Sequence, residues 1–345
     1  MLGSSLRGFG LGLAVVTVAA VGIIFAGYLD LLKPFGPHVL AAQTNAAYAV
    51  PSGTRFSDLV RDWQQRGFIS NPYALRWYGR ISKDAQHIKA GEYTIEEDDT
   101  PLSLLRSLVK GRTVQHAITL VEGWTFKQIR AAIAQEAKLS QTLVGLDEVQ
   151  IMARLGAGGQ HPEGRFFPDT YYFTRGQKDI DVLQRAHAAM RLYLAAAWPT
   201  RATGLPYDSP YDALIMASIV EKETGAAQER EAIAGVLVRR LKKNMLLQTD
   251  PTVIYGMGER YAGNIRKKDL REDTPYNTYV HKGLPPTPIA NPGAAAIDAA
   301  LNPTSGSALY FVAKGDGTGT HVFSDTYAQH RRAVEAYRAR LRKRS

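Results

Sequence analysis

A glutamate near the end of an apolar helical segment is the first candidate for chemistry in this sequence. Residues 211–224 are typical of a helix, and the side chains that share one face with Glu221 are Leu214, Ala217 and Ser218. No Lys or Arg stands three or four residues from Glu221, so no ion pair within the helix accounts for it. Burial there would raise the pKa of this carboxyl group, as a general acid requires. On the residues alone, Glu221 is either a general acid or an ordinary rim carboxylate.

A second group of polar residues follows in segments that are rich in proline and aromatic side chains. Residues 247–256, 274–279 and 283–293 carry little charge, which favours ordered loops that line a groove over a flexible linker. Asp250 before Pro251 indicates a turn or an extended entry. Glu223 lies about 200° around the helix from Glu221, so the two glutamates are not expected to share a site.

Composition excludes several classes of protein. The chain has 345 residues, a net charge of +10 and no cysteine, so a disulfide framework and a cysteine nucleophile are both excluded. The last fifteen residues hold six arginines, one lysine and one glutamate, a net charge of +6, and the rest is close to balance. This distribution argues against a nucleic-acid partner. There is no G-x-S-x-G, P-loop or H-E-x-x-H motif.

The elements around these residues begin with an apolar N-terminal segment. Residues 8–29 carry no charge, and as a helix they would extend about 33 Å, enough to cross a bilayer. We therefore predict a cytoplasmic head at residues 1–8, a single transmembrane helix at 9–29 and a linker at 30–47. The signal from flanking basic residues is weak, and a short head inside with the large body outside is the favoured orientation.

Two similar phrases follow the predicted linker. Residues 50–59 and 121–129 each read as a strand, a glycine turn and a helix that begins after Ser or Thr. A strand at 91–95 and a helix at 102–109 lie between them. This pattern resembles the LysM domain, a strand-helix-helix-strand unit that binds amino-sugar polymers. Alternatively, these segments only brace the following domain.

The C-terminal half alternates helices with loops. A helix at 228–243 ends in a basic run, which suits the negative end of a helix dipole. Residues 309–313 and 321–324 predict a β-hairpin around a Gly-rich turn. The chain ends in a helix with an apolar stripe and many arginines.

Longer motifs resemble one family over nearly the whole chain. They are residues 217–224 (ASIVEKET), 248–258 (QTDPTVIYGMG), 275–279 (PYNTY), 283–293 (GLPPTPIANPG) and the segment at 163–171 (EGRFFPDTY). Together they are similar to the membrane-anchored endolytic murein transglycosylases, the MltG or YceG-like family. The resemblance implies an α+β fold with three parts: a single N-terminal transmembrane helix, a LysM-like module at 48–140, and a mixed α/β catalytic domain at 141–345 that carries the acid on a helix and ends in the basic helix.

The resemblance also implies a reaction and its residues. Such enzymes are lyases that cleave the β-1,4 bond between N-acetylmuramic acid and N-acetylglucosamine without water and leave a 1,6-anhydro end. It places Glu221 as the single acid and base, with no cofactor and no metal. Candidates for holding the sugar are Gln248, Asp250, Tyr276, Asn277, Tyr279, Glu223 and Glu163, although each could instead order a loop.

The implied setting is the outer side of the cytoplasmic membrane. Glycan strands of peptidoglycan would be the substrate, strand termination the outcome, and penicillin-binding synthases the partners. Two alternatives remain: a glycoside hydrolase that uses water with Asp250 as second carboxylate, and a non-catalytic wall-binding scaffold for synthases.

Overall fold

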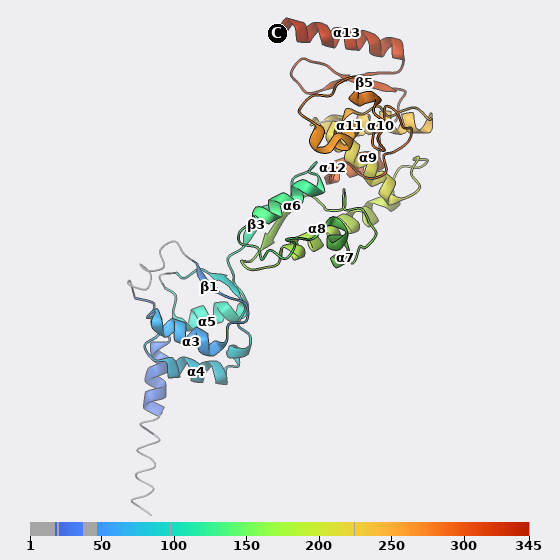
Figure 1. Ribbon diagram of the computed structural model, residues 1–345. Coiled ribbons are helices and arrows are strands. Elements are labelled where there is room, and N and C mark those ends of the chain that lie inside the picture. Colours follow the sequence, from blue (N-terminus) through green and yellow to red (C-terminus); the bar gives the residue numbers. More distant parts are fainter. Residues whose placement is uncertain (1–17, 19–20, 37–46, 97, 224, 345) are drawn as a thin grey trace, which may run out of the picture. The chain divides into compact units, whose positions relative to one another are not determined.

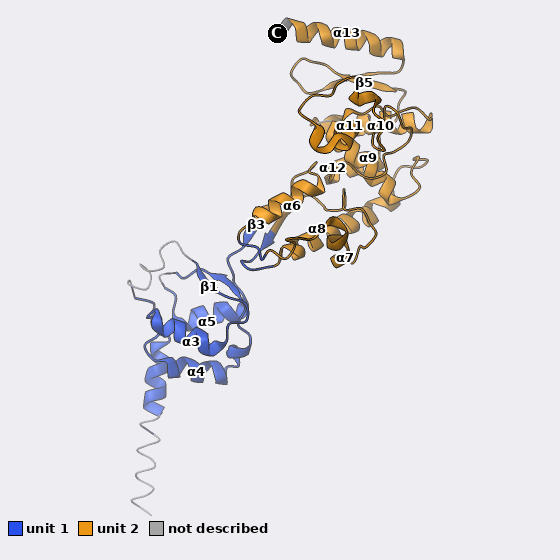
Figure 2. Cartoon of the chain, viewed as in Figure 1, with its two compact units in different colours: residues 1–116, 138–140, 172–177 blue, residues 117–137, 141–171, 178–345 orange. Residues whose placement is uncertain are grey.

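The computed structural model describes residues 18, 21–36, 47–96, 98–223 and 225–344. The protein is mixed α+β and mostly helical, and its strands form small two-stranded sheets (Figure 1). It divides into two compact units (Figure 2). The first comprises residues 1–116, 138–140 and 172–177, and the second comprises 117–137, 141–171 and 178–345. Residues 117–137, which the sequence assigns to the small module, therefore cluster with the larger unit.

The predicted membrane segment is covered only in part. The head at residues 1–8, and residues 9–17 and 19–20 of the predicted span, lie outside the described residues. Residues 21–30 form a helix. Among the residues that the structure describes, no helix has both the length and the apolar character needed to cross a membrane.

From β1 to β2 the first unit has the order strand, helix, helix, strand, and a further helix follows. Its elements are β1 (Tyr48–Val50), α3 (Phe56–Gln65), α4 (Pro72–Ile81), the 3-10 turn η1 (Asp84–Gln86), β2 (Gly91–Tyr93) and α5 (Pro101–Lys110). Strands β1 and β2 pair antiparallel, with Ala49 opposite Glu92. Trp63, Leu75 and Leu105 are fully buried between these elements. The predicted helix at 102–109 is confirmed, and its N-cap is Thr100, whose hydroxyl accepts the backbone N–H of Ser103 in a capping box.

Part of the predicted linker belongs to this folded unit. Leu31 and Phe35 are only 1% and 6% exposed and lie in its core. The backbone N–H of Leu102 donates to the Leu31 carbonyl at 3.1 Å, and the N–H of Phe35 donates to the Asp99 carbonyl at 2.9 Å. Two apolar side chains that a free linker would leave in water are therefore covered. Residues 37–46 lie outside the described part.

The second unit contains the candidate active site. Its helices are α6 (Phe126–Gln135), α7 (Glu148–Arg154), α8 (Asp179–Ala197), α9 (Pro210–Glu223), α10 (Arg230–Lys242), α11 (Asp250–Met257), α12 (Ala294–Leu301) and α13 (Tyr327–Arg344), with 3-10 turns η2 (Trp198–Thr200), η3 (Ala227–Glu229), η4 (Gly258–Arg260) and η5 (Asp269–Arg271). Strands β3 (His116–Thr119) and β4 (Thr170–Phe173) form one sheet, and β5 (Tyr310–Ala313) and β6 (His321–Ser324) form another.

Helix α9 is at the centre of this unit. Its residues from Ala213 to Val220 are all buried, and it packs against α10 and α12 in the main core. The predicted helix at 211–224 is thus confirmed within a residue at each end.

Two other local predictions differ in outcome. The hairpin of β5 and β6 is confirmed, with Phe311 opposite Phe323, and α13 packs against both strands. At Asp250-Pro251 the predicted turn or extended entry is wrong, because α11 begins at Asp250. Proline fits the first turn of a helix, where no partner for its missing N–H is needed.

Candidate active site

Glu221 lies in the last turn of α9 and has two polar neighbours from distant parts of the chain. Its side chain is 8% exposed. The backbone N–H of Gly293 donates to Oε2 at 3.0 Å, and Nη2 of Arg230 lies 3.8 Å from Oε1. Gly293 is the residue that precedes α12, so the carboxyl group also lies at the positive end of that helix. Glu221 therefore has a hydrogen bond at Oε2 and an ion-pair contact at Oε1.

The Pro-rich loop at residues 283–293 is hydrogen-bonded to α9 and to the turn at residues 122–124. The hydroxyl of Ser218, on α9, accepts the backbone N–H of Ile289 at 3.0 Å. Further on, the N–H of Gly123 donates to the Asn291 carbonyl at 2.9 Å, and the N–H of Asn291 donates to the Trp124 carbonyl at 2.8 Å. These paired backbone bonds bring the turn at 122–124 next to the loop that contacts Glu221.

Glu122, in that turn, places a second carboxylate near Glu221. A β-carbon at residue 293 would collide with the carboxylate of Glu122. The side chain of Glu122 fits here only because residue 293 is glycine. On the other side of the turn, a β-carbon at Gly123 would stand 3.6 Å from Cγ of Glu221. The two glutamates thus approach each other across glycine positions. Like charges at such a site favour protonation of one partner.

The pKa of Glu221 is raised above its ordinary value. Burial is the main cause, and the negative charge of Glu122 adds to it. The hydrogen bond from Gly293 and the positive charges of Arg230 and Lys222 act in the opposite direction without cancelling the effect. A carboxyl group in this environment retains its proton to higher pH than a free glutamate, as a general acid needs.

Glu163 joins the elements that surround this site. Its Oε1 accepts the backbone N–H of Phe126 at 2.9 Å and Nδ2 of Asn291 at 3.2 Å, and its Oε2 accepts the Tyr255 hydroxyl at 3.1 Å. The Oδ1 of Asn291 in turn accepts the N–H of Phe166 at 2.9 Å. Burial raises the pKa of Glu163 to about 7. Both carboxyl oxygens of Glu163 accept hydrogen bonds from other parts of the protein. Glu163 therefore orders the surrounding loops.

Comparison with known proteins identifies the family. Residues 48–336 match the model of the YceG-like family. The chain belongs to the YceG-like family. It is 32% identical over 318 residues to the endolytic murein transglycosylase of Bacillus subtilis, which covers 86% of each chain. It is 26% identical to the protein of that name from Streptococcus pneumoniae, over 84% of this chain and 58% of the other. A crystal structure of a yceG-like protein from Listeria monocytogenes, 31% identical, matches with a TM-score of 0.55 over 82% of this chain and 97% of that one.

In this YceG-like protein, Glu223 and Asp250 form a second polar group. The Tyr279 hydroxyl donates to Oδ1 of Asp250 at 2.6 Å, and Nη1 of Arg240 donates to Oε1 of Gln248 at 3.3 Å. Burial, and then the charge of Asp250, raise the pKa of Glu223 to about 8. Neither Glu223 nor Asp250 is among the groups whose charges shift the pKa of Glu221. The two glutamates of α9 therefore have different surroundings, as their angular separation predicts.

Tyr276 and Asn277 differ in how deeply their side chains are buried and in their hydrogen-bond partners. The Tyr276 hydroxyl shares a hydrogen bond of 2.9 Å with the hydroxyl of Thr287, and its side chain is half-buried. Asn277 is 1% exposed, and its Nδ2 donates to the backbone carbonyls of Asp269 and Glu272 at 3.2 and 2.8 Å. The amide of Asn277 is therefore engaged in shaping the loop.

Three neighbours of Glu221 were not identified from the sequence as site residues: Glu122, Arg230 and Gly293. Arg230 lies nine positions after Glu221, beyond the reach of a helical ion pair, and the other two are far away in sequence. Glu122 and Gly293 lie in segments that the sequence singles out, but nothing local links either of them to Glu221, because backbone pairing between the turn at 122–124 and Asn291 brings them to the site. Among the described residues, no three His, Asp or Glu side chains gather in a metal-binding group.

We expect Glu163→Gln to change how stability depends on pH. The folded state holds the proton of Glu163 with a pKa of about 7 against 4.5 in the unfolded chain. This group's contribution is therefore fully present below the unfolded value and is lost as pH rises through the folded value. Glutamine cannot ionise. As pH rises from about 5 to about 8, the free energy of unfolding of the wild type should therefore fall by about 2–3 kcal/mol relative to that of the variant.

Urea unfolding at the two pH values checks this expectation. Glu335→Gln, on the exposed surface of α13, is the matched control and should leave the pH dependence as it is. A Glu163→Gln variant whose stability follows the wild type at both pH values contradicts the prediction.

Proposed function

We propose that this YceG-like protein is an endolytic lytic transglycosylase of peptidoglycan. It would cleave the β-1,4 bond between N-acetylmuramic acid and N-acetylglucosamine and leave 1,6-anhydro ends. The observation that carries the proposal is the Glu221 carboxyl group: buried, held by Gly293 and Arg230, and raised in pKa. The relatives named endolytic murein transglycosylase support the substrate class.

One carboxyl group is sufficient for this reaction. Protonated Glu221 donates its proton to the glycosidic oxygen as the bond to the muramic C1 breaks. The C6 hydroxyl of the same sugar then attacks C1 and gives its proton to the Glu221 carboxylate, which restores the acid. The nucleophile is part of the substrate, so its effective concentration is high and no second carboxylate is required.

The polar residues around Glu221 would divide between substrate and framework. We propose that Gln248, Asp250, Tyr276 and Tyr279 contact sugar hydroxyl and amide groups, with Glu223 beside them. Each of these side chains has a hydrogen-bond donor or acceptor, and each is partly exposed or lies next to a partly exposed residue. Asn277 and Glu163, whose polar atoms are bonded inside the protein, would act by holding the loops.

Hydrolysis is the second candidate reaction, and Glu122 is the observation that favours it. A hydrolase uses two carboxyl groups, one of them to activate water or attack C1. Glu122 is a better candidate for the second carboxyl group than Asp250, because the charge of Glu122 acts on Glu221. Digestion of purified glycan strands with product masses separates the two reactions. Anhydro ends, lighter by one water than reducing ends, are expected; reducing ends favour hydrolysis, and intact strands at every pH favour a scaffold.

The charge of Glu122 provides a test that does not depend on product masses. We expect Glu122→Gln to remain active but to lose activity at lower pH than the wild type. Removing the negative charge lowers the pKa of Glu221, so the acid form disappears earlier as pH rises. The pH profile of kcat/KM measures this, with Glu335→Gln as the control. Loss of cleavage at all pH values would instead make Glu122 a chemical participant and contradict the single-carboxyl reaction.

We further propose the location and partners. Residues 9–29 would anchor the protein in the cytoplasmic membrane with its N-terminus inside and its body outside. The first unit would act as a LysM-like module on glycan strands, which its strand-helix-helix-strand order supports. Cleavage near the membrane would end the elongation of new strands, with penicillin-binding synthases as partners.

A further inference from the structure

Helix α4 of the first unit has an exposed face that mixes aromatic, aliphatic and basic side chains. Tyr73, Trp77 and Ile81 are spaced by four residues and are 74%, 47% and 62% exposed. Arg76, Arg80 and Lys83 accompany them, all exposed, and residues 72–83 contain no acidic residue. We call these six residues the α4 outer face. Large side chains of this kind rarely remain in water together without a partner surface.

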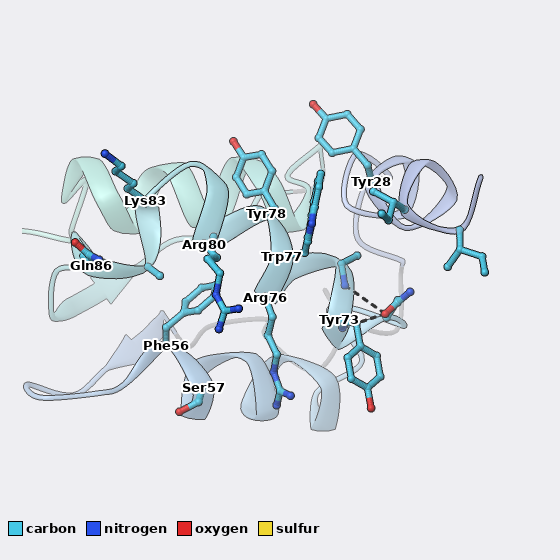
Figure 3. Close-up of a pocket in the computed structure, with 16 residues that line it drawn as sticks. Tyr28, Phe56, Ser57, Tyr73, Arg76, Trp77, Tyr78, Arg80, Lys83 and Gln86 are labelled. Carbon is cyan, nitrogen blue, oxygen red and sulfur yellow. Dashed lines mark hydrogen bonds between the residues drawn. The ribbon is translucent and has the colours of Figure 1, made fainter. Parts of the chain in front are cut away.

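The helix at residues 21–30 arrives beside this face. Gly27 packs closely on α4, because a β-carbon there would stand 2.8 Å from Cβ of Ala74. The ring of Tyr28 stacks on that of Tyr78 with centroids 6.2 Å apart. Ile23, Ile24 and Tyr28 line one hollow together with residues of the α4 outer face (Figure 3). The apolar surface of α4 is thus continuous with that of the helix that leads out of the predicted span.

The connection between that helix and the unit is short and fixed. Leu31 and Phe35 are buried in the core of the unit and bonded to α5 and the turn before it. The helix itself exposes Val21, Ile23 and Phe25 by 60% or more. Such side chains belong in lipid when the segment before them crosses a membrane. A unit joined this closely cannot move far from the bilayer surface.

The direction of α4 suits a membrane interface. In Figure 1, α4 runs crosswise to the helix of residues 21–30. When that helix enters the bilayer along its normal, α4 lies along the headgroup layer. Tyr and Trp prefer this layer, while Arg and Lys reach anionic headgroups with their charged ends.

We infer that the α4 outer face lies in the headgroup layer of an anionic bilayer and holds the first unit against the membrane. This inference rests on the proposed membrane anchor and is independent of the proposed reaction. A membrane is the favoured partner of this face, because the basic residues complement anionic lipid and the exposed apolar helix adjoins the face. The glycan-binding side of the unit must then be a different one.

The lack of cysteine allows a direct test on the full chain. Spin labels are placed on single-cysteine variants, Tyr73→Cys or Ile81→Cys, with Ala49→Cys on the exposed side of β1 as the control. The protein is reconstituted into vesicles of phosphatidylglycerol and phosphatidylethanolamine, and flotation confirms its attachment. We expect labels at 73 and 81 to collide several-fold less often with a water-soluble nickel chelate than the label at 49.

A charge variant completes the experiment. Replacing Arg76, Arg80 and Lys83 by Ser, or using phosphatidylcholine vesicles, should remove much of the shielding while flotation persists. Equal exposure of all three labels in anionic vesicles overturns the inference. Shielding that needs added glycan strands also overturns it, in favour of a glycan site. Failure of the wild type to float overturns the anchor and this inference together, whereas 1,6-anhydro products test the reaction separately.

Discussion

Glu221→Gln is expected to abolish the release of 1,6-anhydro products. Glutamine matches glutamate in shape and can still accept the N–H of Gly293, but it cannot donate a proton to the glycosidic oxygen or accept one from the C6 hydroxyl. General acid-base catalysis contributes about 10²–10⁴-fold, so a loss of at least about a hundredfold in kcat is expected. Product analysis by mass spectrometry on purified glycan strands measures it.

The control for this variant is on the neighbouring helix. Glu231→Gln changes an exposed carboxylate at the start of α10 and should leave cleavage at the wild-type rate. The ion-pair partner of the buried Glu221, Arg230, is 3.8 Å away, so the contact is weak. Replacing Glu221 by Gln should therefore not lower the urea midpoint. Near-normal cleavage by Glu221→Gln would contradict both the proposed reaction and the role of this residue.

Asn291→Ala is expected to have the largest effect on stability. Asn291 is fully buried, and its side chain accepts the N–H of Phe166 and donates to the Trp124 carbonyl and to Glu163. Alanine leaves these buried groups without that partner, at about 1–3 kcal/mol for each unsatisfied group. We expect the free energy of unfolding to fall by about 3 kcal/mol, because some groups retain other bonds.

The same substitution should also reduce cleavage. Asn291 joins the turn that holds Glu122 to the loop that supplies the Gly293 N–H to Glu221, so loosening it disturbs the acid. Urea unfolding and kcat/KM at a temperature where the variant is folded measure the two effects. Asn264→Ala, on the exposed surface, is the control and should stay within about 0.5 kcal/mol of the wild type. An Asn291→Ala variant as stable as that control would contradict the prediction.

The positions of the two glutamates on α9 show how far local pattern reaches. The 3.6-residue period places Glu221 and Glu223 on different sides of one helix, and the structure surrounds them with different partners. The capping residues Thr100 and Thr125 likewise begin helices where the sequence predicts them. These features depend on residues within a turn or two of each other.

Other features could not be read in this way. Asp250 begins a helix although proline follows it, and Leu31 and Phe35 enter a core although their segment resembles a linker. For Leu31 and Phe35 neighbouring elements decide the outcome, because burial and packing outweigh weak local preferences. At Asp250 the helix can begin because the following proline lies in the first turn, where its missing N–H needs no partner.

The sequence by itself determined the helix that carries Glu221, the hairpin near the C-terminus and the motifs of the YceG-like family. Only the tertiary structure decided which groups meet that carboxyl group: Glu122 from a turn about a hundred residues earlier, the N–H of Gly293 and the guanidinium of Arg230. The physical reason is range. Periodicity and capping act between near neighbours in the chain, whereas the pKa of Glu221 depends on burial and on charges brought together by backbone pairing of distant loops.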